Sequence, residues 1–497
     1  MSTSLPRLGA AQLPALQSHL LGGALGEPAI GIVHLGLGNF HRAHQAVYTE
    51  QAMLAAGGDW GICGVTVLDE PAMQQALAEQ DNLYSVLTSD RDGQQVQVVR
   101  AIRKVLVAPR QQAEVLAQMR DPRVRIVSLT VTEKGYCYDA KTNGLDFKHP
   151  AVQHDLLNPD TPKSVPGYLV AALRTRRDNP FTVLSCDNLA HNGKILRNVV
   201  VQYAHAIDPE LGKWVAESVR FPCTMVDRIV PATTDEIRDI VARITGCRDA
   251  WPVPGESFRQ WVIEDNFAAG RPAWEKVGAM LVDDVIPYEL AKLRMLNGTH
   301  STMAYLGVLG GFETVDQAIA DPDMYKLIHA MMTEEIAPTL TVPDSFDRAA
   351  YRDQLLMRYA NPNLKHKTMQ IASDGSLKLP PRLLGTIAER IAAGASYRRL
   401  TLAVAAWMRF LLGRSDAGLS YAINDPMAAK LTELANLSGG DNMCLANFLL
   451  GLEDIFPPAL ASHAGFRAEL MLALTSLDRQ GARGSIAHYA GTAGLAG

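Results

Sequence analysis

The length, composition and charge of the chain limit the kinds of protein it can be. Its 497 residues exceed what one ordinary hydrophobic core accommodates, so we expect two large domains. A hydrophobic content of 47% with 20% charged residues is typical of a globular protein and argues against disorder. The formal net charge is -5 and there is no dense run of lysine and arginine, so nucleic acid is not an expected partner.

Neither a membrane segment nor a targeting segment is evident. No stretch reaches the roughly 20 apolar residues that cross a membrane, and the first residues lack a basic region followed by an apolar run. We therefore expect a cytoplasmic protein with no membrane partner. The six cysteines are scattered singly without a C-x-x-C pair, which favours reduced, buried thiols; they are Cys63, Cys137, Cys186, Cys223, Cys247 and Cys444.

The first part of the chain alternates strand and helix patterns. IGIVHL at residues 30–35 is a β-branched run that ends at Gly36, and the helix-like FHRAHQAVYTEQAMLAA follows. Further strand-like runs are WGICGVTVL, VRIVSLTVT and FTVLSCDN, with helical patterns between them. Apolar strands separated by helices predict a parallel sheet with both faces covered, an α/β Rossmann-like domain.

From about residue 285 the pattern becomes helical, with few strand signals. We therefore predict a Rossmann-type domain over residues 1–285 and a mainly α-helical domain over residues 286–497.

A glycine turn follows the first strand, where a dinucleotide-binding loop is expected. Gly36 can make the tight turn, and Gly38 lets the backbone approach a pyrophosphate at the start of the helix, where Asn39 and Phe40 lie. His41 occupies the place of the third glycine in the common fingerprint, so we expect the helix to pack less closely on the sheet. A plain turn is the alternative for two glycines after a strand.

Asp69 follows the second strand, where an acidic side chain can accept hydrogen bonds from the ribose hydroxyls of NAD and repel the phosphate of NADP. Its spacing from the glycines exceeds the usual value of about 20 residues, which a longer first helix would explain. A solvated loop acid is the alternative.

Several segments between residue 35 and about 380 together resemble one family: LGLGNFHRAHQAVYTE, VSLTVTEKGYC, VLSCDNLAHNG, TMVDRIVP, QWVIEDNF, GRPAWEKVG, KLRMLNGTHS and SDGSLKLP. They resemble the polyol-specific long-chain dehydrogenases, also called the mannitol dehydrogenase family. The resemblance implies an expanded Rossmann domain followed by a helical domain, and carbohydrate oxidoreductase activity with NAD or NADP and without zinc.

The resemblance also implies catalytic residues. The family's catalytic lysine lies in K-x-x-x-x-N-x-x-H, which Lys292, Asn297 and His300 match, and Asn188 matches an asparagine of the S-C-D-N segment. Glu289 resembles the family's acid that connects the lysine to water. For each of these residues taken alone, the alternative to a catalytic role is an ordinary side chain that is solvated or packed in the core.

The residue chemistry agrees with those roles. At about 100° per residue, Glu289 and the three residues of the K-x-x-x-x-N-x-x-H motif fall within an arc of about 140° on one helix face. Reduction of a ketone at C2 needs a proton donor, a role that suits Lys292. It also needs amide donors to the developing alkoxide, a role that suits Asn188 and Asn297. Oxidation requires a neutral Lys292, with its pKa lowered from about 10.4 by burial and a neighbouring cation.

Further positions bear on the substrate. Asp227 matches a family acid near the substrate hydroxyls, with an ion pair to the adjacent Arg228 as the alternative, and Lys378 matches a substrate-contacting lysine, with an exposed loop charge as the alternative. For Asp187, which precedes Asn188, a structural role as the cap of the strand end is the alternative to a reactive role.

Three other residues favour a sugar-acid substrate over a polyol. Lys134 stands where mannitol 2-dehydrogenases tend to have glycine, Arg294 lies in the catalytic helix, and Gln370 replaces a substrate-binding arginine. Extra cations suit a carboxylate, so the expected reaction is D-fructuronate and NADH to D-mannonate and NAD. Met369, where fructuronate reductases often have tryptophan, and the GLGNF motif depart from that subgroup.

Other functions stay open. Interconversion of mannitol and fructose, or another polyol reaction, uses the same machinery, and a non-catalytic nucleotide-sensing protein could use the same fold. His41 and His44 lie three residues apart, but no further ligands follow at suitable spacing, so we expect no metal site. No heptad pattern is sustained, and we expect a monomer with a small sugar acid or polyol as its only partner.

Overall fold

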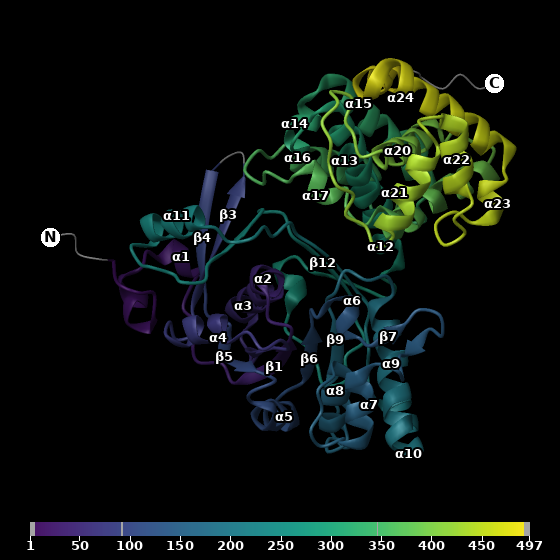
Figure 1. Ribbon diagram of the computed structural model, residues 1–497. Helices are drawn as coiled ribbons and strands as arrows, with labels where there is room; N and C mark the ends of the chain where they lie inside the picture. Colours follow the sequence, from purple (N-terminus) through teal and green to yellow (C-terminus); the bar gives the residue numbers. More distant parts are fainter. Residues whose placement is uncertain (1–4, 91–92, 345, 492–497) are drawn as a thin grey trace. The chain divides into compact units, whose positions relative to one another are not determined.

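The computed structural model describes residues 5–90, 93–344 and 346–491 of the chain. The chain divides into two compact units, with the boundary between Ile286 and Pro287. The first unit combines sheets and helices, and the second is built from helices (Figure 1).

A five-stranded parallel sheet forms the centre of the first unit. The strand order is β5-β2-β1-β6-β9, and every neighbouring pair is parallel. From β1 the chain runs outward to β2 and β5, then returns to the other side of β1 for β6, so the strand order reverses between β1 and β6. Ligands of open α/β sheets bind at the carboxyl ends of the strands at such a reversal. The strands are β1 Ile30–Leu35, β2 Gly61–Thr66, β5 Ile102–Val107, β6 Ile126–Leu129 and β9 Thr182–Ser185.

The helices of the first unit precede, connect and follow these strands. They are η1 Ala10–Ala15, α1 Ser18–Leu21, α2 Asn39–Ala43, α3 Gln45–Ala56, α4 Pro71–Ala78, α5 Gln112–Arg120, α6 Thr132–Gly135, α7 Pro150–Leu157, α8 Val165–Leu173, α9 Asn192–Ile207, α10 Pro209–Ser218, α11 Asp235–Thr245 and η2 Trp274–Val277.

Helices cover both faces of the parallel sheet, which confirms the Rossmann-like prediction. Successive side chains of a strand point to opposite faces. Val33 of β1 belongs to a core shared with α5, α8 and α9, whereas Ile32 belongs to another core shared with α3 and with Trp261 and Trp274. Strand β1 therefore carries apolar side chains on both faces of the sheet, as a strand of a covered parallel sheet does.

The sequence patterns did not reveal three smaller sheets in this unit. One has the order β10-β12-β13, a second has the order β11-β3-β4, and the third pairs β7 with β8. These strands are β3 Tyr84–Asp90, β4 Gly93–Val99, β7 Tyr138–Asp139, β8 Gly144–Leu145, β10 Thr224–Asp227, β11 Val253–Gly255, β12 Gln260–Glu264 and β13 Met280–Val282.

The second unit is helical, with isolated β-bridges as the only strand pairing among its described residues. Three segments, η3, η4 and η6, are π-helical. The elements are α12 Ile286–Ala291, η3 Lys292–Gly298, α13 Thr299–Gly310, α14 Val315–Ala320, α15 Pro322–Ala330, η4 Met331–Ile336, η5 Ala337–Thr339, α16 Arg348–Tyr359, α17 Thr368–Ile371, α18 Gly375–Leu379, η6 Pro380–Leu384, α19 Gly385–Ala392, α20 Arg398–Phe410, α21 Ala428–Leu437, α22 Asn442–Leu450, α23 Pro458–Ala461 and α24 Ala464–Gly491.

Helix α13 lies at the centre of the helical unit. All its residues from Thr299 to Leu309 are buried, and it packs against α17, α20 and α24. A helix that is buried on every side belongs to a core rather than to a surface. The helix that carries His300, the last residue of the K-x-x-x-x-N-x-x-H motif, is therefore a fixed support for the candidate catalytic residues.

The prediction for the cysteines holds for five of the six. Cys63, Cys137, Cys186, Cys223 and Cys247 are buried, but Cys444 is exposed near the start of α22. All six are free thiols. In the described parts of the chain, no helix is both long and apolar enough to span a membrane.

Candidate active site

The glycine turn begins at the carboxyl end of β1 with a backbone that only glycine fits. Gly36 has a φ of +92°, and a Cβ there would lie 2.2 Å from the carbonyl oxygen of Thr130. The N–H groups of Gly36 and Leu37 both donate to the carbonyl of Val65, at 2.8 and 3.0 Å. These bonds fix the turn against β2, beside the reversal of strand order.

The second glycine leaves the start of α2 open. Gly38 is the N-cap residue, no side chain caps the helix, and a Cβ at this position would have only the carbonyl of Gly36 nearby, at 3.8 Å. The first N–H groups of a helix have no partner within it and can donate to a phosphate. Asn39 instead uses its amide oxygen to accept from Arg42, at 2.7 Å, and Phe40 stacks on His44.

His41 fills the space that a third glycine would leave empty. Its buried ring stacks on that of His34 in β1, with centroids 3.4 Å apart. Burial lowers the pKa of both histidines, that of His34 to about 3, so both rings are neutral. The predicted single helix after the turn is wrong, because His44 has non-helical backbone angles and separates α2 from α3.

Asp69 lies just beyond β2 on the surface. Its carboxylate forms an exposed ion pair with Arg110, with Oδ1 and Nε 2.5 Å apart. Exposed pairs of this kind contribute about 0 to 1 kcal/mol, so the arginine does not prevent Asp69 from binding another donor.

The S-C-D-N segment follows β9 at the same sheet edge. Asp187 accepts from the backbone N–H groups of Val131 and Thr132, at 3.1 and 2.8 Å, and from the hydroxyl of Tyr136 at 2.8 Å. These bonds confirm the cap alternative for Asp187. Asn188 is exposed, as is Lys134 in α6, so the segment presents an amide at the strand end.

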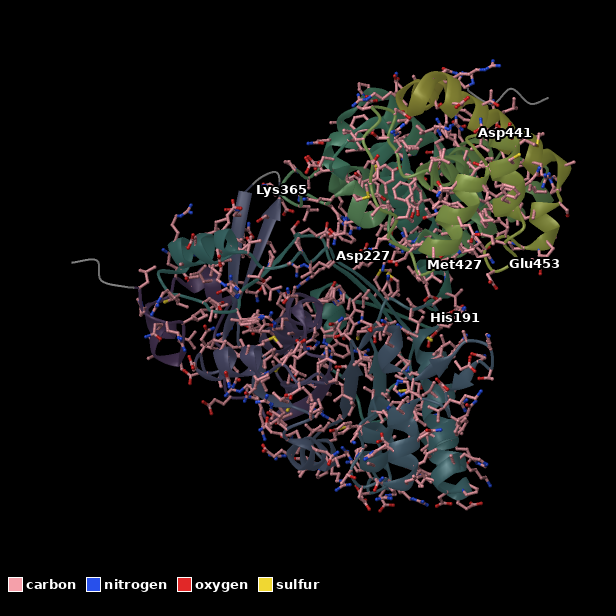
Figure 2. The ribbon with its side chains drawn as sticks, in the orientation of Figure 1. His191, Asp227, Lys365, Met427, Asp441 and Glu453 are labelled. Carbon is pink, nitrogen blue, oxygen red and sulfur yellow. The ribbon has the colours of Figure 1, made fainter. Side chains whose placement is uncertain are left out.

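Asp227 is the last residue of β10 and is buried; Figure 2 labels it. The neighbouring Arg228 donates to two backbone carbonyls, those of Ala43 and Glu256. The guanidinium group therefore ties β10 to the end of α2.

The predicted α-helical arc for the lysine motif is wrong in its geometry. The motif runs through a π-helical segment, η3, between α12 and α13. π-Helical turns close hydrogen bonds from i to i+5, and single turns of this kind are frequent at functional sites. Residues five apart, such as Lys292 and Asn297, therefore lie over each other more nearly than an α-helix allows.

The motif residues differ in exposure. Lys292 and His300 are buried, whereas Glu289 and Asn297 are half-buried. A lysine on an exposed helix is normally solvated, so burial of Lys292 sets it apart from that alternative.

His300 lies among other aromatic rings. Its ring stacks on Tyr359, with centroids 5.3 Å apart, and meets His366 edge-on at 4.9 Å. The hydroxyl of Tyr359 donates to the carbonyl of Leu296 at 2.9 Å, which connects α16 to η3. The ring of His300 is therefore held from the side of α16 and of the loop that carries His366.

Positive charge surrounds the two histidines. Burial lowers the pKa of His300 well below 6.5, and the charges of Arg382, Arg358 and Lys378 lower it further; the neighbouring His366 adds to the effect. Burial and then Lys378 lower the pKa of His366. Both rings are therefore neutral at physiological pH.

Two of these cations are fixed by hydrogen bonds. Arg382, in η6, donates to the hydroxyl of Ser301 at 3.0 Å and to the carbonyl of Asn297 at 3.4 Å. Lys378 donates to the carbonyls of Ser373 and Ile371, at 2.6 and 3.2 Å. The side chain of Lys378 is only 22% exposed, so Lys378 is not an exposed loop charge.

Arg294 does not join this cluster as predicted. Its guanidinium group makes two hydrogen bonds to the carboxylate of Glu389, at 2.5 and 2.7 Å, and further bonds to Thr339. Two short hydrogen bonds to one carboxylate compensate the charge of Arg294 closely, whereas the Nζ of Lys378 lies 3.7 Å from the nearest oxygen of Asp374, so Arg294 is the less available of the two for a substrate. Gln370, in α17, is exposed.

Within the helical unit, the structure thus brings Asn297, His300 and Lys378 into one cluster. Sequence reasoning missed His366, Arg382 and Tyr359, which complete it. These three residues lie in separate loops and helices, and no spacing in the sequence connects them to His300. The glycine turn, Asp69, Asn188 and Asp227 belong to the other unit. No group of three or more metal-ligating side chains occurs in the described ranges.

Comparison with known proteins identifies the family. The model of the mannitol dehydrogenase Rossmann domain matches residues 30–276, and that of the mannitol dehydrogenase C-terminal domain matches residues 284–478. A D-mannonate oxidoreductase of Escherichia coli (strain K12) is 45% identical over 92% of this chain and 95% of its own length. A mannitol 2-dehydrogenase of Phaeosphaeria nodorum is 43% identical over 93% of this chain and 81% of its own length.

Solved structures agree with the sequence comparison. The ternary complex of Pseudomonas fluorescens mannitol 2-dehydrogenase with NAD and D-mannitol is similar, with a TM-score of 0.84, 38% identity and coverage of 97% of this chain and 99% of that one. A substrate-free D-sorbitol dehydrogenase has a TM-score of 0.89 and 35% identity, with coverage of 96% and 100%. The chain therefore belongs to the mannitol dehydrogenase family and is an oxidoreductase that acts on a CH–OH group or the matching ketone.

Proposed function

We propose that the chain is an NAD-dependent reductase of a sugar acid, which converts D-fructuronate to D-mannonate at C2. The observation that carries this choice is the positive charge around His300. Lys378, Arg382 and Arg358 all act on this one ring, and both histidines there are neutral. A cluster of this kind suits a substrate with a carboxylate, which makes stronger hydrogen bonds to cations than a hydroxyl does.

The residues of the glycine turn fit a dinucleotide. Gly36 and Gly38 leave the start of α2 open to a pyrophosphate, and Asp69 offers a carboxylate to the ribose hydroxyls. When bound, the nicotinamide ring gives or accepts the hydride. NAD rather than NADP fits Asp69, because its carboxylate repels a 2′-phosphate.

The chain's own residues supply the acid–base chemistry. In reduction, Lys292 donates a proton from Nζ to the C2 oxygen, and in oxidation it takes that proton back. The side-chain amide of Asn297 donates to the same oxygen as its negative charge grows. The neutral ring of His300 donates to or accepts from the substrate without adding a charge, while Glu289 exchanges protons between Lys292 and water.

Residues of the first unit, together with Gln370 of the second, are proposed for the remaining roles. Asn188 is a second amide donor to the developing alkoxide, and Asp227 accepts hydrogen bonds from substrate hydroxyls. Lys134 and Gln370 are proposed as further substrate contacts, because both are exposed.

Oxidation of mannitol to fructose is the second candidate. It is favoured by the similarity to the mannitol 2-dehydrogenase complex and to the fungal mannitol 2-dehydrogenase. The two reactions share a mechanism and differ in the group at the end of the sugar, so the charge of the substrate separates them.

Steady-state kinetics with NADH test the proposal. We expect kcat/KM for D-fructuronate to exceed that for D-fructose, and Lys378→Gln to lower the value for fructuronate by about tenfold more than the value for fructose. Lys367→Gln is the matched control, because Lys367 is an exposed lysine at the start of α17. Preference for fructose, or an equal effect of Lys378→Gln on both substrates, would reject the sugar-acid assignment.

A further inference from the structure

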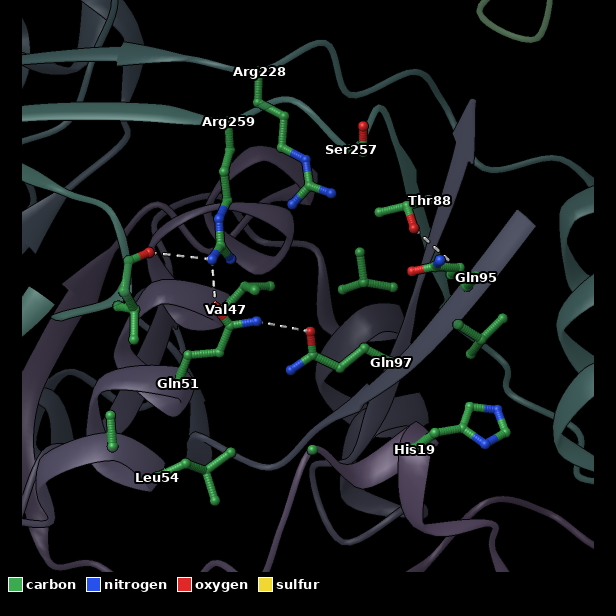
Figure 3. A pocket seen from close by; sticks show the side chains of 15 residues that line it. His19, Val47, Gln51, Leu54, Thr88, Gln95, Gln97, Arg228, Ser257 and Arg259 are labelled. Atoms are coloured by element: carbon green, nitrogen blue, oxygen red, sulfur yellow. Dashed lines mark hydrogen bonds between the residues drawn. The ribbon is translucent and has the colours of Figure 1, made fainter. Parts of the chain in front are cut away.

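A cavity of about 700 Å³ lies in the first unit, apart from the glycine turn. One wall is the helix α3, with Val47, Gln51 and Leu54, and another is the β3–β4 hairpin (Figure 3). Neither the glycine turn nor Asp69 is among the residues that line it. Ligand pockets in proteins have volumes of about 300 to 1,000 Å³, so the cavity is large enough for a metabolite.

The charge of the lining is positive. Arg228 and Arg259 both line the cavity, and Figure 3 shows their guanidinium groups directed into it. Of the described residues that line it, none is acidic. The chain as a whole has a net charge of -5, so this concentration of positive charge is local.

Neither arginine has a carboxylate partner among the described residues. Arg228 donates to two backbone carbonyls, as described above, and Arg259 donates to the side-chain oxygen of Gln51 and to the carbonyl of Val277 at 3.5 Å. The Arg259 guanidinium lies over the ring of Tyr48, 4.2 Å from its centre. All of these hydrogen-bond and ring partners are neutral, and the carboxylates of Glu256 and Asp90 act on Arg228 only as nearby charges, so the compensation of the two positive charges is partial.

This arrangement is electrostatically costly. Burial and the charge of Arg259 lower the pKa of Arg228 to about 10, and burial lowers the pKa of Arg259. Two like charges near each other in a partly buried site favour a counter-ion. A bound anion would offset this cost, because one guanidinium group can donate two parallel hydrogen bonds to the oxygens of one carboxylate or phosphate.

The rest of the lining shows what else the ligand would carry. Gln95, Gln97, Thr88 and Ser257 supply amide and hydroxyl groups, and the valine and leucine side chains of α3, β3 and β4 supply an apolar floor. A bare inorganic ion would leave most of these groups without a partner. A hydroxylated organic anion would use both kinds of wall.

We propose that this cavity is a second ligand site, which binds a small hydroxylated organic anion bearing a carboxylate or phosphate group through Arg228 and Arg259. The site is separate from the glycine turn and does not depend on the reaction proposed above. Citrate represents the carboxylate source and D-glucose 6-phosphate the phosphate source.

Calorimetric titration of the full chain with each probe tests the proposal, with NAD present at saturation to occupy the cofactor turn. We expect saturable binding of at least one probe, weakened about tenfold by Arg259→Met. Arg125→Met is the matched control: Arg125 also lies over an aromatic ring, Trp60, and donates to a backbone carbonyl, that of Asp59. The control should leave binding unchanged, and both variants should keep the wild-type circular dichroism.

The two probes identify the source of the anion. Binding of citrate alone points to a carboxylate metabolite, and binding of D-glucose 6-phosphate alone points to a phosphate. Failure of both probes to bind would overturn the proposal, as would loss of binding when NAD is added or equal weakening by Arg125→Met. Should Arg259→Met fail to fold, Gln51→Met serves instead, because Gln51 positions the Arg259 guanidinium.

Discussion

Gly298 lies against the backbone of Arg382: a Cβ on Gly298 would be 2.9 Å from the carbonyl oxygen of Arg382. The π-helical segments η3 and η6 therefore meet at this glycine. The Arg382 side chain then reaches the carbonyl of Asn297 and the hydroxyl of Ser301. One small residue thus sets the distance between the motif that carries Lys292 and the arginine beside His300.

We expect Gly298→Ala to push η6 away and to misplace both groups. Insertion of a methyl group into a tight contact costs about 1 to 3 kcal/mol, and kcat/KM should fall by about tenfold or more. Thermal unfolding and steady-state kinetics measure the two effects. Gly385→Ala is the control, because a Cβ there has its nearest neighbour at 3.8 Å; an equal effect of both substitutions would contradict the account.

Arg294 is expected to matter for stability and not for substrate. Arg294→Met removes the bonds to Glu389 and Thr339, and because the Glu389 side chain is half-exposed and water can replace the lost donor, we expect a cost of about 1 kcal/mol. The KM for the sugar acid should stay within about twofold of wild type. An increase in KM of about tenfold, with an unchanged unfolding temperature, would return Arg294 to the substrate site.

Asp69 should control the choice of cofactor. Its pair with Arg110 is exposed and weak, so Asp69→Ala removes a carboxylate that repels the NADP phosphate and leaves Arg110 to attract it. We expect the ratio of kcat/KM for NADPH over NADH to rise by about tenfold. Asp69→Ala combined with Arg110→Ala should lose part of that gain; an unchanged ratio in both would show that Asp69 does not contact the ribose.

Buried neutral histidines predict how stability depends on pH. Burial lowers the pKa of each of five histidines in the fold, namely His34, His41, His300, His329 and His366. The unfolded chain binds protons at these groups below pH 6.5 and the folded chain does not. Their contribution to stability is therefore fully present above the unfolded pKa and is lost as pH falls below it.

The free energy of unfolding should consequently be constant above about pH 7 and fall between pH 6.5 and 5.5, at up to about 1.4 kcal/mol per pH unit for each histidine. The thermal unfolding midpoint should follow it. Two glutamates, Glu50 and Glu335, have pKa values raised by burial and act in the opposite sense above pH 4.5. The five histidines outweigh them near pH 6. A midpoint that rises as pH falls from 7 to 5.5 would show that the rings are protonated in the fold.

The sequence predicts those features that depend on neighbours along the chain. The strand at 30–35, the glycine turn and the change to helices after residue 285 all follow from local periodicity and from the φ that Gly36 needs. The π-helical turn at Lys292 does not, because α- and π-helical turns favour similar residues. The partner of Arg294 lies 95 residues away, and His366 and Arg382 reach His300 only through the packing of the helical unit.

Lys292 provides the most direct test of the central claim. The measurement is kcat for reduction of D-fructuronate by NADH, with wild type and Lys292→Ala, together with NADH binding by fluorescence. The account predicts a loss of about hundredfold or more in kcat with NADH affinity unchanged, since only the proton donor is removed. A variant that keeps kcat within about threefold of wild type would contradict the assignment of Lys292 as the general acid.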